Sequence, residues 1–317
     1  MRLVMSGAAG FIGSHLVERL LADGHFVRVL DDFSTGKRGN LELVSAGAPA
    51  GCFELIEGSL VDLDTCRRAV EGVDGVLHQA ALPSVPRSVR DPLGSNAANV
   101  DGTLNLLVAA RDAKVRRMVQ ASSSSVYGNS PTLPKHEGMA TNPRSPYALT
   151  KLAGEVYARL FFELYGLETV CLRYFNVFGP RQDPKSEYAA VIPRFITALL
   201  DGQAPTIFGD GEQTRDFVFV GDVVAALLLA MERQDKSARV FNVARGEAVT
   251  LLRLVAALER VIGRKAVLRH APPRAGDVRH SIGDVRRIRE SLGFAAMVGL
   301  EEGLASLLGW LKSAGGA

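Results

Sequence analysis

The feature that most constrains the fold is a glycine-rich turn near the start of the chain, Gly7-Ala8-Ala9-Gly10-Phe11-Ile12-Gly13. An apolar run at residues 2–6 precedes this turn, and apolar residues at helical spacing follow it as far as Gly24. Strand, glycine turn and helix in that order predict a dinucleotide-binding unit, because glycines let the backbone approach a pyrophosphate at a helix N-terminus. Glycines also serve ordinary turns, so this motif needs support from the rest of the chain.

Two carboxylates, Asp31 and Asp32, follow the next apolar run, residues 26–30. An acidic residue about 20 residues after the glycines hydrogen-bonds the adenosine ribose and repels a 2′-phosphate. The position therefore favours NAD over NADP as cofactor, although Lys37 and Arg38 follow closely enough to compensate. The alternative is that both aspartates only cap a loop.

Strand-like and helix-like segments alternate through the first half of the chain, which predicts an α/β fold with a doubly wound parallel sheet of the Rossmann type. The expected strands lie near residues 2–6, 26–31, 52–57, 74–79, 115–121 and 168–173, and the expected helices near 11–23, 63–71, 94–113 and 146–166. After Arg173 glycines and prolines interrupt the pattern. We therefore expect an NAD-binding domain of residues 1–175 with 218–245, and a smaller substrate-binding lobe of residues 176–217 with 246–317.

Composition excludes several classes of protein. The chain has 317 residues, 47% of them hydrophobic, and can bury a substantial core. A net charge of +3 without a long basic run gives no indication of nucleic-acid binding. The longest apolar stretch, residues 223–231, is too short to span a membrane, and the N-terminus enters a strand at once, so we expect no signal peptide. Three scattered cysteines predict free thiols and a cytoplasmic protein, and six histidines without ligand spacing predict no metal site.

A tyrosine and a lysine four residues apart, Tyr147 and Lys151, follow the helix-start signal Ser145-Pro146 and share one helix face. A tyrosine has an ordinary pKa of about 10, which is too high for a base at neutral pH. A nearby ammonium and a positive nicotinamide ring would favour the phenolate and lower that pKa. Such a pair is usually just two neighbours on a helix, and the glycine turn is what favours the catalytic interpretation.

Four serines, Ser122 to Ser125, follow the strand expected near residues 115–121. Their hydroxyls would lie at the carboxyl end of the sheet, where such folds bind ligands. Ser123, four residues before Tyr127, is our candidate for the hydroxyl that bonds the reacting oxygen. The alternative is an ordinary polar transition from strand to loop. With the glycine turn, these residues predict hydride transfer between a sugar-like alcohol and a nicotinamide.

At these residues the chain resembles the extended short-chain dehydrogenase/reductase superfamily nearly from end to end, and within it the nucleotide-sugar 4-epimerases, above all bacterial UDP-N-acetylglucosamine 4-epimerases. Supporting segments are residues 84–88, 95–103, 173–179 and 209–217. The resemblance implies bound NAD, a UDP-sugar substrate and the catalytic residues Ser123, Tyr147 and Lys151. The implied cofactor site consists of Gly7, Gly10, Phe11, Ile12, Gly13, Asp31, Asp32, Ser34, Gly36, Ser59, Leu60, Gln79, Ala80, Ala81, Asn99, Ser122, Tyr147, Lys151 and Tyr174.

The resemblance also implies a substrate site. Its members are Ser84, Ser123, Ser124, Tyr147, Asn176, Ala190, Val191, Phe208, Arg215, Arg274, Asp277 and Ser281. Asn176 would bond near the phosphates, Arg215 and Arg274 would clamp the diphosphate, Phe208 would stack on uracil, and Asp277 would hold the uridine ribose. Alternatively, Arg215 forms a surface pair with Asp216, and Phe208 belongs to the core.

By resemblance, Tyr147 takes the proton of the sugar C4 hydroxyl while C4 gives hydride to NAD. The 4-keto sugar then turns over, and hydride returns to its other face, so NAD stays bound.

Ser124 and Ser125 stand where dehydratases carry an Asp-Glu pair, and Ser125 is not the Glu of decarboxylases. Asp183-Pro184 replace the basic residues of uronate epimerases, and Ser59 replaces an Asp near the adenine.

Ser281 lies where a tyrosine restricts some relatives to UDP-glucose and UDP-galactose, so we expect UDP-GlcNAc and UDP-GalNAc to be accepted as well. Alternatively, Ser281 is an ordinary loop residue. The alternatives for function are an epimerase restricted to non-acetylated sugars, a UDP-uronate 4-epimerase, and a non-catalytic NAD-binding sensor.

The helices near 94–113 and 146–166 carry apolar residues on more than one face. These helices predict a homodimer through a four-helix bundle, or else a wider core face.

Overall fold

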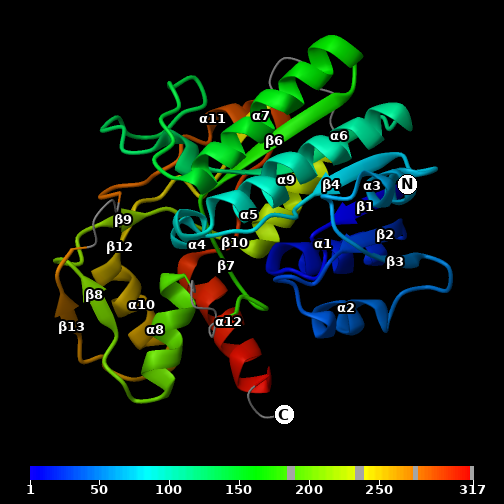
Figure 1. Ribbon diagram of the computed structural model, residues 1–317. Helices are drawn as coiled ribbons and strands as arrows, with labels where there is room; N and C mark the ends of the chain where they lie inside the picture. The colour runs from blue at the N-terminus through cyan, green and yellow to red at the C-terminus, as the bar shows by residue number, and fades with distance from the viewer. Residues whose placement is uncertain (184–189, 233–238, 274–277, 315–317) are drawn as a thin grey trace.

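The computed structural model (Figure 1) describes residues 1–183, 190–232, 239–273 and 278–314. Its centre is a seven-stranded sheet in the order β11-β6-β5-β4-β1-β2-β3, in which every neighbouring pair is parallel. The strands are β1 (Arg2–Ser6), β2 (Phe26–Asp31), β3 (Phe53–Glu57), β4 (Gly75–His78), β5 (Arg117–Ser123), β6 (Glu168–Tyr174) and β11 (Val240–Val243). The strand order reverses between β1 and β4, which is where a Rossmann-type sheet opens a crevice for ligands. The predicted α/β Rossmann fold is confirmed.

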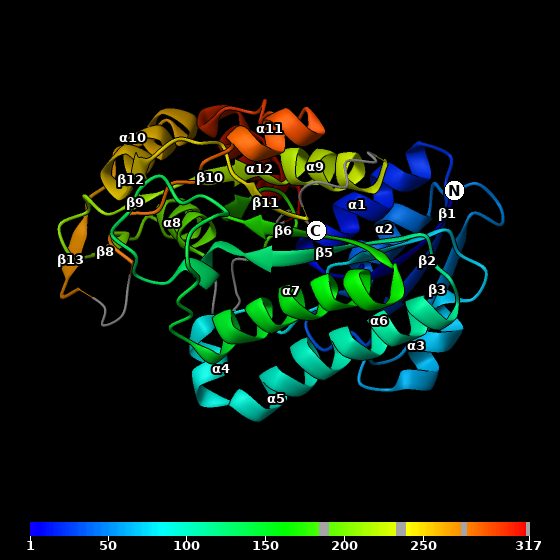
Figure 2. The same ribbon diagram turned by 90° about the horizontal axis from the view of Figure 1, so that it is seen from above.

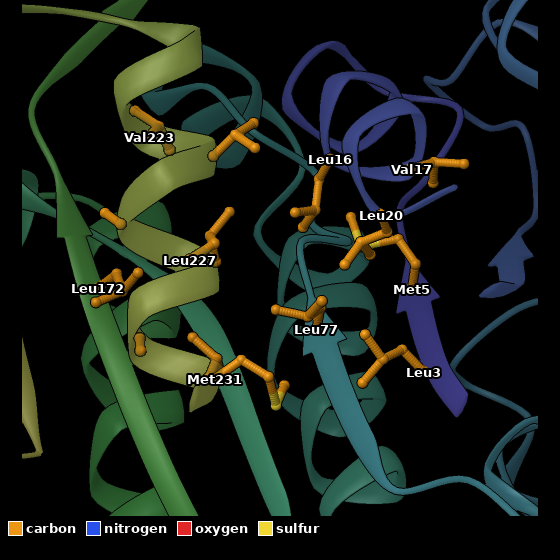
Figure 3. Packing of buried hydrophobic residues seen from close by; sticks show 14 of the residues in the cluster. Leu3, Met5, Leu16, Val17, Leu20, Leu77, Leu172, Val223, Leu227 and Met231 are labelled. Atoms are coloured by element: carbon orange, nitrogen blue, oxygen red, sulfur yellow. The ribbon is translucent and has the colours of Figure 1, made fainter. Parts of the chain in front are cut away.

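Helices cover both faces of this sheet (Figure 2). One layer contains α1 (Phe11–Ala22), α2 (Arg38–Ser45), α9 (Val220–Glu232) and α11 (Arg286–Leu292), and the other contains α3 (Leu63–Val70), α6 (Gly102–Asp112) and α7 (Pro146–Tyr165). Figure 3 shows the first layer from close by: Leu16 of α1 and Leu227 of α9 lie over Leu77 of β4. Because these strands are apolar on both faces, both layers are needed to bury them.

The helix predicted near residues 94–113 is divided into several pieces. After α4 (Val85–Arg90) and α5 (Pro92–Asn96), a π-helical turn at Ala97–Asp101 precedes α6. The extra residue of the π turn turns Asn99 inward, where its side-chain amide bonds the backbone N–H and carbonyl of Leu82. The regular apolar spacing of this segment gave no indication of the interruption.

The smaller lobe has a core of its own, built on helices α8 (Val191–Leu200), α10 (Leu251–Ile262) and α12 (Leu300–Ala314). Three two-stranded pairs connect it, namely β7 (Asn176–Phe178) with β10 (Phe217–Phe219), β8 (Thr206–Phe208) with β13 (Arg269–Ala271), and β9 (Thr214–Arg215) with β12 (Val249–Thr250). The predicted domain division is wrong at α11, because Ile288, Leu292 and Phe294 pack in the core of the large sheet. The chain returns there after its excursion through the lobe.

Within the described parts of the chain, no helix combines the length and the apolar character that crossing a membrane requires.

Candidate active site

The glycine turn joins β1 to α1 at the point where the strand order reverses between β1 and β4. Gly7 has φ +72°, and a Cβ there would lie 2.5 Å from the backbone nitrogen of Ala80, while a Cβ at Gly13 would overlap the carbonyl oxygen of Gly7. No side chain of the described residues caps α1, whose N-cap is Gly10. The first-turn N–H groups and the positive end of the helix dipole are therefore available to a pyrophosphate, and these residues fit a bound dinucleotide.

Asp31 holds the glycine turn in place. Its carboxylate accepts hydrogen bonds from the backbone N–H groups of Ala9 at 2.8 Å and Phe33 at 2.9 Å, and burial raises its pKa. The exposed Asp32 accepts one from the N–H of Ser34. Asp32 is thus the more open of the two carboxylates predicted to hold the ribose.

The two basic residues that could have accepted a 2′-phosphate are both paired with carboxylates. Lys37 lies 3.0 Å from Asp183, and Arg38 bonds Glu57 while its guanidinium lies 3.9 Å from the centre of the Phe33 ring. Neighbouring Gly36 packs against Ala9, where a side chain would clash. This arrangement is consistent with NAD rather than NADP.

The other predicted cofactor residues gather at the same edge of the sheet. Phe11 and Ile12 open α1, Ser59 and the buried Leu60 follow β3, and Gln79, Ala80 and Ala81 follow β4. Two of these residues are hydrogen-bonded to each other, since the Tyr174 hydroxyl donates to the Gln79 side chain at 2.8 Å. Asn99 is occupied with Leu82 and Thr150, so its side chain supports the site rather than facing it.

The three predicted catalytic residues meet where β5 ends and α7 begins. Ser145 caps α7 by accepting from the N–H of Ala148, and Ser88 of α4 accepts from the N–H of Tyr147 at 3.0 Å. Ser123 accepts hydrogen bonds from both the backbone N–H and the hydroxyl of Ser125, so its own proton remains available to the nearby Tyr147 oxygen, whose pKa it lowers.

Lys151 acts from one turn farther along α7. Its Nζ donates to the carbonyl of Ala121 at 3.1 Å and lies 6.0 Å from the centre of the Tyr147 ring. Burial lowers the pKa of this lysine to about 8. An ammonium held at this place favours negative charge nearby.

The expected lowering of the Tyr147 pKa is not produced by these residues alone. Burial raises the pKa of Tyr147, and the hydrogen bond from Ser123 opposes that rise. The reason is that the lysine ammonium is directed at Ala121 rather than at the phenol. The positive ring of an oxidised nicotinamide would add the missing attraction when NAD is bound.

A buried polar chain below the site escaped the sequence analysis. Thr103 donates to the carbonyl of Asn99 at 2.6 Å, so it must accept from Nε2 of His78 at 2.9 Å. The other ring nitrogen of His78 then accepts from Ser6 at 2.7 Å. Burial lowers the pKa of His78 to about 3, so the ring is neutral. A histidine in an otherwise apolar strand was the signal that could have revealed it.

A second group missed from the sequence is a buried ion pair. Glu155 of α7 bonds Arg173 of β6 at 2.6 Å and 2.8 Å, and both side chains are 5% exposed. The Ser122 hydroxyl donates to the same carboxylate at 2.5 Å. Ser122 was predicted to bind the cofactor, but its side chain is directed to Glu155. The position of Glu155, four residues after Lys151, was the available signal.

The predicted substrate residues that the structure describes come from several separate elements. Ser84 caps α4, Ser124 begins a 3₁₀ turn at Ser124–Tyr127, and Asn176 opens β7 with a half-buried side chain. Ala190 and Val191 start α8, and Phe208 ends β8, partly buried. The N–H of Ser281 donates to Thr214 at 3.2 Å, which places Ser281 beside Arg215 of β9. The predicted roles of Arg274 and Asp277 lie outside the described residues.

In the described part of the chain, no group of three or more His, Cys, Asp or Glu side chains is arranged to hold a metal ion.

Comparison with known proteins agrees with this site. Residues 3–244 match the family described as NAD dependent epimerase/dehydratase. The chain is 44% identical over 315 residues to a UDP-glucose 4-epimerase of Mycolicibacterium smegmatis, covering 99% of each chain. The cofactor is therefore NAD, as predicted.

Two solved structures share the whole fold. One is a UDP-N-acetylglucosamine 4-epimerase from Methanobrevibacter ruminantium in complex with UDP-N-acetylmuramic acid, with 39% identity, a TM-score of 0.93, and coverage of 99% of this chain and 98% of that one. The other is a UDP-glucose 4-epimerase from Thermotoga maritima with UDP-glucose, with 37% identity, a TM-score of 0.92 and coverage of 99% of each chain. The chain belongs to the NAD dependent epimerase/dehydratase family.

Proposed function

We propose that this enzyme is a UDP-sugar 4-epimerase that uses tightly bound NAD, with Tyr147 as its acid–base residue. One observation carries the proposal: Tyr147, Ser123 and Lys151 converge at the carboxyl end of β5, at the same edge of the sheet as the start of α1. A phenol, a hydroxyl donor and an ammonium around one point are what removal of a carbinol proton requires.

Each residue has a distinct task. Bound NAD supplies the hydride acceptor and, in the reverse direction, the hydride donor. Tyr147 takes the proton from the sugar hydroxyl and returns it after the sugar has turned, so no net proton is lost. Ser123, whose hydroxyl lowers the pKa of Tyr147, would also hydrogen-bond the reacting oxygen. Lys151 keeps positive charge beside the phenolate and favours its formation.

The preferred substrates in this proposal are UDP-GlcNAc and UDP-GalNAc, with UDP-Glc and UDP-Gal also accepted. Ser281 is small and half-buried, and its backbone is anchored to Thr214 next to Arg215. A serine at that place leaves space beside the sugar that a tyrosine would fill. The likeness to an enzyme named for UDP-N-acetylglucosamine supports the same choice.

Restriction to non-acetylated sugars is the main alternative, and the relatives named UDP-glucose 4-epimerases favour it. A uronate substrate is a weaker alternative, because the residue after Gln182 is the acidic Asp183, which is paired with Lys37 and offers no cation to a substrate carboxylate. A non-catalytic sensor would not need the Tyr147–Ser123 hydrogen bond.

The test is incubation of the purified protein with UDP-Glc, UDP-GlcNAc and UDP-GlcA separately, with products resolved by proton NMR. We expect the 4-epimers of the first two to form. Conversion of UDP-GlcA alone, or of no sugar, would contradict the proposal.

We also propose that the protein is a homodimer through a four-helix bundle formed by α7 and by the segment near residues 94–113, which runs from α5 to α6. Leu93 is 83% exposed and Leu149 is 57% exposed, and both line a groove of about 540 Å³ together with Pro92 and Pro146. Figure 2 shows these helices along one side of the molecule. A second copy related by a twofold axis would bury this apolar surface in a four-helix bundle.

Light scattering tests this assembly. We expect the mass of a dimer for the parent protein and of a monomer for Leu149→Asp. Met297→Asp, which changes a residue of similar exposure in another part of the fold, serves as the control and stays dimeric. A monomeric parent protein would refute the assembly.

A cytoplasmic location is a further proposal, based on the free cysteines Cys52, Cys66 and Cys171 and testable by cell fractionation.

A further inference from the structure

Two residues one turn apart on α7 hold two consecutive residues of β5. Lys151 donates to the carbonyl of Ala121, and four residues later Glu155 accepts the hydroxyl of Ser122. The next residue of β5 is Ser123, whose hydroxyl opposes the rise in the pKa of Tyr147 at the start of the same helix. The contacts between α7 and β5 therefore connect the helix that carries Tyr147 to the strand that carries Ser123.

The carboxylate of Glu155 also joins a third element. In the register of the sheet Ser122 pairs with Arg173, and Ser123 pairs with Tyr174. Glu155 bonds both Ser122 and Arg173, so it ties α7, β5 and β6 together directly below Ser123. Because the ion pair of Glu155 and Arg173 is almost fully buried, its hydrogen bonds are strong, and the two side chains are restricted to a small range of positions.

We propose that Glu155 is a positioning residue, which acts through Ser122 to hold the Ser123 hydroxyl against Tyr147. The inference rests on the proposed role of Tyr147 as acid–base residue. Glu155 itself touches neither of these catalytic side chains in any hydrogen bond of the described residues, so its effect is indirect. It sets the distance between the strand that carries Ser123 and the helix that carries Tyr147.

A second contact between α7 and the sheet provides a matched comparison. Thr169 of β6 donates its hydroxyl to the carbonyl of Ala158 at 2.7 Å, and it is 1% exposed. This hydrogen bond docks the same helix on the same sheet, but no catalytic residue follows it. If the Ser122–Glu155 bond only stabilised the packing of α7, removing either bond would have the same consequences.

The charged and titratable groups around this part of α7 do not complicate the pH dependence of activity. His78 of β4 has a pKa of about 3, and Tyr127 has one raised to about 12 by burial. Burial raises the pKa of Cys171, and although burial itself lowers the pKa of Arg173, its bonds to Glu155 raise it overall. None of these four groups changes its charge between about pH 6 and pH 9, so a change of activity there reports on Tyr147 and Lys151.

The experiment compares Ser122→Ala with Thr169→Val in the protein carrying its NAD. For Ser122→Ala we expect kcat to fall on the order of tenfold with little change in KM, because the reacting groups are slightly misplaced. The acidic limb of the kcat profile should move to higher pH, since Tyr147 loses the hydrogen bond that lowers its pKa. Thr169→Val should lower the melting temperature similarly but keep the parent kcat and pH profile.

Equal effects of the two variants on kcat and pH profile would overturn the proposal, and so would a loss of bound NAD in Ser122→Ala. A titration of phenol absorbance, with Tyr147→Phe subtracted, needs no substrate and separates this inference from the proposed function. If Ser122→Ala leaves the Tyr147 titration unchanged, Glu155 has no positioning role, whichever sugar the enzyme uses. If the titration moves while no UDP-sugar is converted, the proposed function fails and the positioning role stands.

Discussion

The Nζ of Lys151 lies 6.0 Å from the centre of the Tyr147 ring and makes its hydrogen bond elsewhere, to the carbonyl of Ala121. In the proposed mechanism Lys151 therefore acts on Tyr147 only by charge across a buried space, whereas the Ser123 hydroxyl directly opposes the rise in the pKa of Tyr147. In surroundings that exclude water, a charge at this distance has much more effect than it has at the surface. This division of labour leads to separate predictions for the two residues.

Tyr147→Phe removes the proton acceptor but keeps the ring and the helix. We expect epimerisation to fall by at least about a thousandfold, while the affinity for UDP-sugar measured by calorimetry stays within a few-fold of the parent value. The control is Tyr157→Phe, which removes a hydroxyl from the same helix without touching the site. A Tyr147→Phe protein with near-parental turnover would remove Tyr147 from the mechanism.

Lys151→Met should inactivate the enzyme and at the same time stabilise its fold. The pKa of Lys151 falls from 10.5 to about 8 in the folded protein, so the unfolded chain binds its proton more tightly. Keeping this lysine charged at pH 7 therefore costs stability, up to about 3 kcal/mol, and the cost fades as pH rises from 8 to 10.5. Urea unfolding at pH 7 and pH 10 should show a gain for Lys151→Met that is larger at the lower pH. A variant less stable than the parent at pH 7 would contradict this.

The sequence was a good guide to the nucleotide-binding half, because local signals determine it. The apolar run before the glycine turn, the turn itself and the carboxylates after β2 lie within the first part of the chain, and the strand predicted at residues 26–31 has those bounds in the structure. Ser145 and Pro146 likewise start α7 as their capping preferences require.

What could not be predicted depends on contacts between distant segments. The pairing of β8 with β13 joins parts of the chain separated by two helices, and nothing local to either strand indicates it. The π turn at Asn99 exists because that amide reaches Leu82, not because of its own helical preferences. Glu155 looks like an ordinary helix residue until the sheet brings Ser122 and Arg173 against it.

His78 should make the protein sensitive to acid. Its pKa falls from 6.5 to about 3 on folding, so the unfolded chain takes up a proton that the buried ring refuses. The free energy of unfolding therefore decreases as the pH is lowered from 6.5 towards 3, by up to about 5 kcal/mol in total. His78→Gln should flatten this slope between pH 6.5 and pH 4, although it loses stability at pH 7.

The control for this prediction is His270→Gln, which changes an exposed histidine of the lobe. Its slope of stability with pH, measured by urea unfolding, should match that of the parent protein. If His78→Gln keeps the parental slope, the acid sensitivity has another source.

Ser281→Tyr should separate acetylated from non-acetylated substrates. The backbone of Ser281 is fixed to Thr214, so a tyrosine there cannot easily move away, and it would occupy space next to the strand that carries Arg215. Overpacking of this kind costs about 1–3 kcal/mol, which corresponds to roughly tenfold to a hundredfold in kcat/KM for the larger sugar. We expect activity on UDP-GlcNAc to fall by that factor while activity on UDP-Glc stays within about threefold. Ser281→Ala removes the hydroxyl without adding volume and should leave both activities close to parental. Equal losses on the two substrates would show that Ser281 supports the lobe without selecting the sugar, and loss of activity in Ser281→Ala would assign the effect to the hydroxyl instead of to size.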